Sequence, residues 1–449
     1  MDPTKETLTG HVGLEQSVQT SLMGISRKAK RFKDYRFQNL YRLLNILFLL
    51  VSWKKINKKA ASGVDKVSAR KFGYKLMENI GKIVDSLKRK SYKAKLVRRV
   101  NIDKGNGKKR PLGIPVIADK LIQRAVALIL EAIYEQVFIN DSYGYRPKRS
   151  AKQAVKAITD KLMSGNYQYV VEADIKGYFN NINHEWLVRM LELRIDDSQF
   201  IRLIKKWLKA GILEEDGKVK HPVTGTPQGG IISPILANIY LHYALDIWFE
   251  EYIKKVCRGK AYICRYADDF ICLFENKEEA DWFYKKLQTR LNKFNLEISL
   301  EKTNIIGFNR YKYREGNSFN FLGFEIRWGL SRKGKIMIKK RTSRKKLRKS
   351  LHNFTAWCKS YRHKRLWKIF ARLNSKLQGY YNYYGLRGNY DSLEEFFEQA
   401  KKILFKWLNR RSQRKSFSWD EFKKVLKKYR INKPHITEKQ TYQLELKFN

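Results

Sequence analysis

The chain has 449 residues, and its 94 Lys and Arg residues exceed its 43 Asp and Glu residues by 51. Hydrophobic residues make up 43% and aromatic residues 13% of the chain, which excludes a disordered basic tail and predicts a folded protein. A folded body with a net charge of +51 repels itself unless a polyanion lies nearby. The charge therefore indicates nucleic acid or an anionic membrane as the partner, and excludes an ordinary metabolic enzyme.

The apolar segments argue against the membrane. The longest apolar run, Leu43 to Trp53, is too short to span a bilayer and is interrupted by Asn45 and Ser52, so it predicts a buried helix. The first twenty residues lack the apolar core of a signal peptide. The four cysteines form no C-x-x-C pair, which favours reduced thiols in a cytosolic protein.

Hydrophobic spacing and turn residues predict mixed helices and strands up to residue 330. Residues 21–100 are expected to be mostly helical, and a helix over 119–138 follows Asp119, which could cap it. The later expected elements are a strand at 167–174, a helix at 186–210, a helix at 231–254, a hairpin at 261–274, a helix at 277–294, and two or three strands at 297–328.

The character of the chain changes after residue 330. Residues 331–350 contain eleven Lys or Arg residues and no acid. Apolar residues then recur at steps of four and three in segments that begin at Leu347, Leu366 and Leu393. This spacing predicts a bundle of three amphipathic helices with an apolar core and basic outer faces. The tail from about residue 412 is basic and poorly patterned.

Three carboxylates are the candidate metal-binding groups of the sequence. Asp268 and Asp269 lie at the tip of the expected hairpin, and Asp174 ends the expected strand before it. Adjacent like charges are costly without a cation, and hard oxygen ligands suit Mg²⁺ or Mn²⁺. If the strands share one sheet, the carboxylates could hold two metal ions for nucleotidyl transfer. The pair Asp196-Asp197 lacks β-rich flanks and is expected on the surface of a helix or loop.

Nine short motifs follow one another along the chain: Ser62-Gly-Val-Asp65, Lys109-Arg-Pro-Leu-Gly-Ile-Pro115, Asp119-Lys-Leu-Ile-Gln-Arg-Ala125, Tyr143-Gly-Tyr-Arg-Pro147, Asp174-Ile-Lys-Gly-Tyr-Phe179, Gly225-Thr-Pro-Gln-Gly-Gly230, Tyr266-Ala-Asp-Asp269, Leu300-Glu-Lys-Thr303 and Phe321-Leu-Gly-Phe324. In these motifs and in their order, the chain resembles the reverse transcriptases encoded by group II introns. The resemblance covers residues from about 30 to 410 and implies an α+β, right-hand polymerase of fingers, palm and thumb, with an antiparallel palm sheet and a helical thumb. The implied domains are an N-terminal extension with fingers at 1–165, a palm at 166–330 that includes a returning fingers portion near 200–235, a thumb or maturase domain at 331–411, and a basic tail at 412–449.

The resemblance also implies roles for individual residues. Asp174, Asp268 and Asp269 would be catalytic, with Asp174, Asp268 and the backbone carbonyl of Ile175 as metal ligands for two Mg²⁺ ions. Substrate contacts would come from Lys104, Arg110, Phe179, Gln228, Gly229 and Lys302, and a primer grip from Phe321, Leu322 and Gly323. Ordinary structural roles stay open for several of these: a basic turn for Lys104, a core position for Phe179, a surface position for Lys302, a helix start for residues 228–230 and a plain strand for residues 321–324.

The function expected from the resemblance is RNA-directed DNA polymerase activity, together with binding of intron RNA for splicing and retrohoming. Its partners would be an RNA template, a structured intron RNA, a DNA primer or target, and dNTPs, in the bacterial cytoplasm at the nucleoid. The residues after 411 include no Cys and a single His435, so the Cys/His endonuclease of many relatives is expected to be absent. The alternatives are a domesticated relative in phage defence, repair or CRISPR spacer acquisition, and a splicing-only maturase. The sequence leaves the oligomeric state open.

Overall fold

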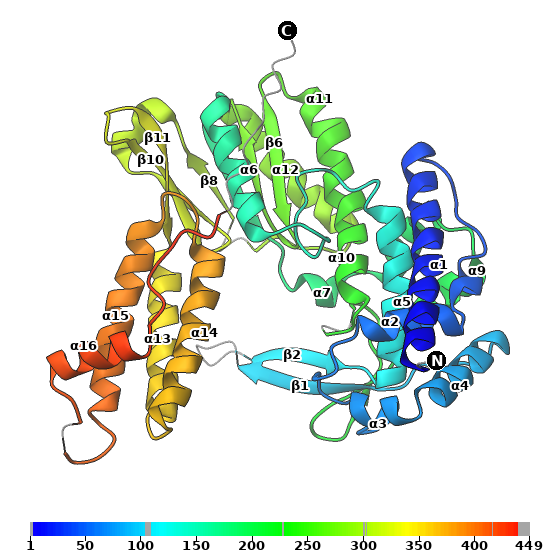
Figure 1. Ribbon diagram of the computed structural model, residues 1–449. Helices are drawn as coiled ribbons and strands as arrows, with labels where there is room; N and C mark the ends of the chain where they lie inside the picture. The colour runs from blue at the N-terminus through cyan, green and yellow to red at the C-terminus, as the bar shows by residue number, and fades with distance from the viewer. Residues whose placement is uncertain are drawn as a thin grey trace, which may run out of the picture.

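The computed structural model describes residues 3–103, 109–226, 229–299, 301, 303–414 and 416–438. Its fold is mixed, with long helices and small sheets that are antiparallel except for one short strand pair (Figure 1). The expected α+β class is thereby confirmed. In Figure 1 the N-terminal helices lie on one side of the molecule, the C-terminal helices lie on the other, and the sheet that contains β6 lies between and above them.

The N-terminal region is built around α5 (Ile117–Tyr134), which is buried on nearly all sides. Helices α1 (Pro3–Arg31) and α2 (Ile46–Lys54) pack against it. The Asn45 side chain accepts a hydrogen bond from the Phe48 N–H and so fixes the start of α2. Because α2 buries residues such as Phe48 and Leu49, the predicted buried helix is confirmed. The other elements of this region are η1 (Tyr41–Leu43), α3 (Ala69–Tyr74), α4 (Leu76–Lys88) and α6 (Ala151–Ser164).

The prediction that Asp119 caps a helix is wrong. Helix α5 begins two residues earlier, at Ile117, so Asp119 lies inside its first turn. The carboxylate is buried and accepts hydrogen bonds from the Tyr92 hydroxyl and the Lys95 N–H. It therefore joins α5 to the segment that leads into β1 (Val97–Asp103). Strand β1 pairs with β2 (Lys109–Ile114) as an antiparallel hairpin, and the short strands β4 (Ile212–Leu213) and β5 (Val219–Lys220) extend this sheet.

The central sheet has the order β6-β7-β3-β8, and every pair in it is antiparallel. Its strands are β3 (Tyr169–Asp174), β6 (Ala261–Tyr266), β7 (Asp269–Phe274) and β8 (Asn304–Gly307). Alternate residues enter different cores: Val171 and Cys272 belong to the large N-terminal core, whereas Val170 and Ile271 belong to a second core. Burial on both faces explains why the sequences of these strands are continuous apolar runs. The antiparallel pairing of β6 with β7 confirms the predicted hairpin at 261–274.

Helices cover this sheet, with one correction to the expected elements. The single helix expected at 186–210 is two helices, α8 (His184–Glu192) and α9 (Ser198–Leu208), because the Asp197 carboxylate accepts hydrogen bonds from the N–H groups of Gln199 and Phe200 and starts a new helix. The helix expected at 231–254 is confirmed, with two π-helical segments inside it. The remaining helical elements are α7 (Tyr178–Asn181), α10 (Ser233–Leu241), the π segments η2 (His242–Asp246) and η3 (Phe249–Ile253), α11 (Lys254–Val256) and α12 (Lys277–Lys293).

The C-terminal third begins with a sheet of order β11-β10-β9 and continues as helices. The predicted three amphipathic helices are confirmed as α13 (Arg344–Tyr361), α14 (Leu366–Tyr384) and α15 (Tyr390–Leu408), and residues of their stripes such as Leu347, Phe370 and Leu404 are buried together. The preceding elements are η5 (Arg310–Glu315), β9 (Ser318–Phe321), β10 (Phe324–Leu330) and β11 (Ile336–Thr342).

The tail after residue 412 is more ordered than its composition indicates. Residues Trp419–Lys428 form α16, which starts with a capping box between Ser418 and Glu421 and buries Phe422 against the bundle. The spacing of Ser418 and Glu421 is the sequence signal that could have predicted this helix.

Among the helices of the described residues, none combines the length and the apolar character that a membrane crossing requires. The domain boundaries stay a prediction.

Candidate active site

Strand register brings the three predicted carboxylates together. Asp174, the last residue of β3, is the direct partner of Asp269, the first residue of β7. Asp269 also pairs with Tyr266 across the hairpin, so the turn between the two strands consists of Ala267 and Asp268. Ala267 has a φ of +59°, in the left-handed region that non-glycine residues rarely adopt. All three carboxylates therefore lie at one end of the central sheet, two in adjacent strands and one in the turn beside them.

Burial and mutual repulsion both disfavour the charged forms of these carboxylates. Burial and the adjacent carboxylates of Asp268 and Asp174 raise the pKa of Asp269 to about 7. Burial also raises the pKa of Asp268, with a further contribution from Asp174, whereas Arg110 and Arg265 oppose the rise. Within the described residues, no group of three or more His, Cys, Asp or Glu side chains is arranged so that it could hold a metal ion. The three carboxylates offer only hard oxygen donors, and donors of this kind suit a hard divalent cation.

A buried network fixes the turn that bears Asp268. The Arg265 guanidinium is fully buried and donates hydrogen bonds to both carboxylate oxygens of Asp246, at 2.7 and 2.5 Å. It also donates to the Ala267 carbonyl at 3.0 Å and to the side-chain carbonyl of Asn238 at 3.1 Å. Burial alone would raise the pKa of Asp246, but Arg265 and His242 hold it below its usual value. Arg265 thus connects the strained turn residue to the π-helical segment η2.

A loop packs on the other side of the same turn. Asn238 donates a hydrogen bond from its amide to the Gly144 carbonyl at 2.7 Å. A Cβ atom on Gly144 would lie 2.3 Å from the Ala267 nitrogen, so only glycine allows this approach. The motif Tyr143–Pro147 therefore supports the turn that bears Asp268 by backbone contact, a role that the sequence did not reveal.

The predicted primer-grip residues lie beside the carboxylates. Asp174, Asp269, Leu322, Gly323 and Tyr383 line one cavity of about 520 Å³. Further residues around this cavity are Glu172, Asn320, Ser343, Lys345, Lys346 and Tyr384.

The primer-grip residues form a tight turn rather than a plain strand. Phe321 and Phe324 pair across it, and the two turn residues have φ values of +51° and +82°. The Tyr383 hydroxyl donates a hydrogen bond to the Leu322 carbonyl at 3.0 Å and so joins α14 to this turn.

The other predicted residues lie around the same end of the sheet. Arg110, on β2, is exposed, and its charge opposes the raised pKa of Asp268. The backbone of Gly229 approaches Gly113, because a Cβ there would meet the Gly113 carbonyl oxygen at 2.5 Å. The buried ring of Phe179 makes an edge contact with Tyr145 at 6.2 Å between centroids. Burial raises the pKa of Tyr145, and the nearby Asp268 carboxylate raises it further, so Tyr145 lies close to both Phe179 and Asp268.

Ile175 is buried directly after Asp174. It forms an isolated bridge with Ile298, and the Ser299 N–H in this bridge donates to the carbonyl of Asp174 rather than to that of Ile175. Lys104, Gln228 and Lys302 lie outside the described residues.

Four residues near the site were not predicted, namely Tyr145, Asp246, Lys346 and Tyr383. An acid in the otherwise apolar segment 233–246 was the available signal for Asp246, whereas Lys346 could not be distinguished within its basic run.

Comparison with known proteins identifies related sequences. The family described as reverse transcriptase (RNA-dependent DNA polymerase) matches residues 102–326. The group II intron-encoded protein LtrA of Lactococcus lactis subsp. cremoris is 34% identical over 460 aligned positions, which cover 83% of this chain and 74% of LtrA. The protein YkfC of Escherichia coli K12 is 30% identical over 74% of this chain and 92% of its own length. An uncharacterised 91 kDa protein in the cob intron of Schizosaccharomyces pombe is 37% identical over 53% of this chain and 30% of its own length.

We predict that Asp246→Ala lowers the free energy of unfolding by about 3–5 kcal/mol, because it leaves the Arg265 guanidinium buried without a counter-charge. Urea denaturation followed by circular dichroism measures this change. The matched control is Asp196→Ala, which removes an exposed ion pair with Arg36 at 3.3 Å and is expected to cost less than about 1 kcal/mol. Equal losses in the two variants would contradict the role of the buried network.

Proposed function

Because the chain belongs to the reverse transcriptase family, and within it to the group II intron-encoded proteins, we propose that Asp174, Asp268 and Asp269 are its catalytic residues. The protein is an RNA-directed DNA polymerase with a second role in splicing. The observation that carries the residue assignment is the register of β3 and β7, which sets Asp174 opposite Asp269 and beside the turn with Asp268. This arrangement supports nucleotidyl transfer from a dNTP to the 3′-hydroxyl of a primer.

The proposed cofactor is a pair of Mg²⁺ ions, for which Mn²⁺ can substitute. Asp174, Asp268 and the backbone oxygen of Ile175 would hold them, with Asp269 in support. The fit rests on hard oxygen donors and on the raised pKa values of Asp268 and Asp269, which result first from burial and then from the neighbouring carboxylates. When bound, such ions supply Lewis-acid stabilisation of the charge that develops on the reacting oxygens. Arg110 would bind the triphosphate through its guanidinium, together with Lys104 or a neighbouring lysine.

The proposed architecture is the right hand, with fingers within residues 1–165, a palm within 166–330 and a thumb within 331–411. The cavity that Asp174 and Asp269 share with Leu322 and Gly323 supports a primer end held at the carboxylates. The thumb helices and the basic run at 331–350 would contact the phosphates of the template and primer. The proposed partners are an RNA template, a structured intron RNA, a DNA primer or target, and dNTPs, at the nucleoid of a bacterium.

The intron-encoded role is favoured over the alternatives. The cluster of three carboxylates disfavours a splicing-only maturase, because RNA binding alone does not require it. Relatives with intron-encoded names favour retrohoming over a domesticated use in defence or repair.

Asp268→Asn is expected to abolish primer extension, because the amide keeps the shape of the side chain but removes the charge that binds the cation. Extension of a DNA primer on an RNA template with Mg²⁺ measures this. Asp196→Asn is the control within the same chain, since Asp196 is the exposed member of the other Asp-Asp pair and lies between α8 and α9, outside the central sheet. Extension that survives in Asp268→Asn would refute the assignment.

Gly144→Ala is expected to lower kcat for primer extension by about 100-fold, because the added Cβ displaces the turn that carries Asp268. Steady-state kinetics with a saturating primer–template measures the change. Gly81→Ala is the control, since a Cβ at that helical position meets nothing within 4 Å. A Gly144→Ala enzyme with the parent kcat would show that the turn does not need this support.

Phe179→Ala is expected to reduce the preference for dNTPs over rNTPs, because the ring lies one aromatic contact away from the carboxylates, where it would exclude a 2′-hydroxyl. The ratio of kcat/KM for dCTP and CTP measures this preference. Phe200→Ala, at a fully buried position in α9, controls for loss of stability alone. An unchanged ratio in Phe179→Ala would assign Phe179 to the core.

A further inference from the structure

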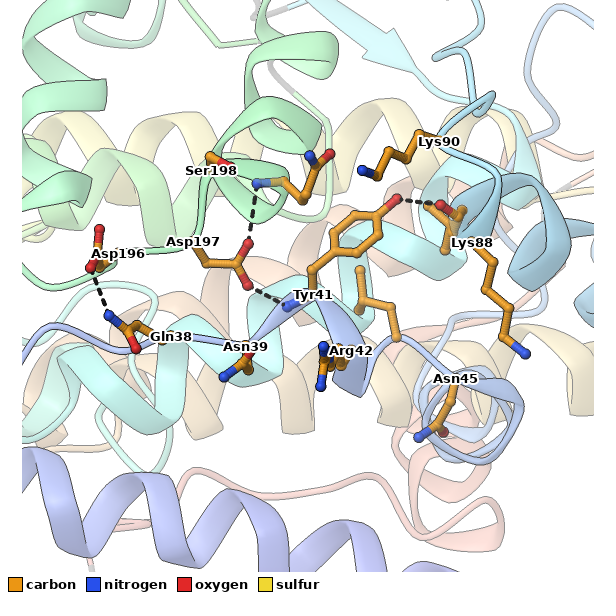
Figure 2. A pocket seen from close by; sticks show the side chains of 13 residues that line it. Gln38, Asn39, Tyr41, Arg42, Asn45, Lys88, Lys90, Asp196, Asp197 and Ser198 are labelled. Carbon is orange, nitrogen blue, oxygen red and sulfur yellow. Dashed lines mark hydrogen bonds between the residues drawn. The ribbon is translucent and has the colours of Figure 1, made fainter.

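A second large pocket lies in the N-terminal region, on elements that bear none of the three catalytic carboxylates (Figure 2). Its volume of about 630 Å³ is within the range of small-ligand sites. It is formed by η1 with the residues around it, the end of α4 and the start of α9. Most of the residues that line it are polar, and they include side-chain amides and three cations. This composition differs from that of a protein core and from that of a docking groove for an apolar helix.

The pocket contains an aromatic ring that is fixed at both ends. The Tyr41 hydroxyl donates a hydrogen bond to the Leu87 carbonyl at 3.0 Å, and its backbone N–H donates to the Asp197 carboxylate at 2.8 Å. Figure 2 shows Tyr41 in the middle of the pocket, with Asp197 on one side and Lys88 and Lys90 on the other. A half-buried ring that cannot rotate away offers a stacking platform to a flat ligand.

The groups around the ring match a nucleotide. Within the described part of the chain, no hydrogen bond engages the side-chain amides of Asn39 and Gln199, so both are available to the edge of a base. Arg42, Lys88 and Lys90 supply positive charge for phosphate. The two acids of the pocket are already engaged by other groups: Asp197 by backbone N–H groups, and Asp196 by Arg36 and Gln38.

Two lining residues hold unfavourable backbone conformations. Asn39 has a φ of +57° and Lys90 a φ of +58°. Lys90 directly follows the C-cap of α4 and donates its N–H to the Leu87 carbonyl, at the position where glycine is preferred. A lysine there costs stability that glycine would recover. Lys90 nevertheless keeps a positive charge at the pocket in spite of this cost.

We propose that this pocket binds one unpaired nucleotide of a structured RNA, with the base stacked on Tyr41, its edge read by Asn39 and Gln199, and its phosphate bound by Lys90 and Arg42. The proposal rests on the RNA-binding role proposed above, and it adds a site separate from the catalytic carboxylates. A free phosphate would need no aromatic platform. A paired nucleotide cannot enter, because its base is stacked and paired within the helix.

The test uses an RNA hairpin with a single-nucleotide bulge and the same hairpin without the bulge, with each of the four nucleotides placed at the bulge in turn. Stacking of one base is expected to make the tightest bulged RNA bind about tenfold better than the unbulged hairpin. Quenching of 2-aminopurine fluorescence at the bulge reports the stacking directly. A protein that binds all the hairpins equally, with no quenching, would overturn the proposal.

The decisive variants are Asn39→Gly and Lys90→Gly. Glycine adopts these φ values without strain, so neither variant should lower the melting temperature, yet both should lose the preference for the bulged RNA. The matched control is Arg430→Gly, because Arg430 has a φ of +44° at the same position after α16 and donates its N–H to the Lys427 carbonyl. It removes one charge at a helix end outside the pocket and should keep the preference.

If Asn39→Gly and Lys90→Gly keep the preference for the bulged RNA, the pocket is not the binding site. Primer extension on a fully paired RNA–DNA primer–template should be unchanged in both variants, since the pocket residues belong to other elements than the carboxylates. Loss of extension with the preference retained would overturn the proposed site as well, because the residues would then act in catalysis. If Asp268→Asn does not stop primer extension, the catalytic assignment is wrong, but the test of the pocket is not affected.

Discussion

The structure of the active end of the sheet depends on the buried ion pair between Arg265 and Asp246. Two charges without exposure to water are stable only when each satisfies the other, and here the guanidinium has further acceptors in Asn238 and the Ala267 carbonyl. Because the guanidinium has a fixed planar geometry, it sets the position of a turn that alanine does not favour. A lysine could not satisfy the same acceptors. The turn that bears Asp268, one of the proposed catalytic residues, is thus held by a buried positive charge that Asp246 compensates.

The strands that bear the proposed catalytic residues could be predicted from the sequence, because they are local patterns. An apolar hairpin with Asp268 and Asp269 at its tip, and a strand that ends at Asp174, are visible in the residue order alone, and both elements are confirmed. The amphipathic helices of the C-terminal bundle could be predicted as well, because apolar residues at alternating steps of four and three residues lie on one face of a helix. These patterns also indicate metal binding by the carboxylates, whereas the roles of Arg110, Phe179 and the residues at 321–323 are implied only by the family resemblance.

What could not be predicted depends on contacts between distant residues. The contact of Gly144 with Ala267 and the hydrogen bond from Tyr383 to Leu322 join segments more than sixty residues apart, and no local spacing indicates them. The wrong prediction of a single helix at 186–210 has a different cause. Asp197 is the N-cap of α9, so a second helix begins inside a segment whose apolar spacing continues. The capping role of Ser418 was missed because the basic composition of the tail concealed it.

The direct pairing of Asp174 with Asp269 also limits how such a chain can evolve. Side chains alternate between the two faces of a strand, so loss or gain of one residue within β3 or β7 would move an aspartate to the opposite face and shift every partner by one. Both faces of this sheet are filled by separate cores, so no bulge could absorb the change without exposing apolar groups. Insertions and deletions are therefore tolerated only in the loops around these strands, whereas the strands themselves can diverge by substitution alone.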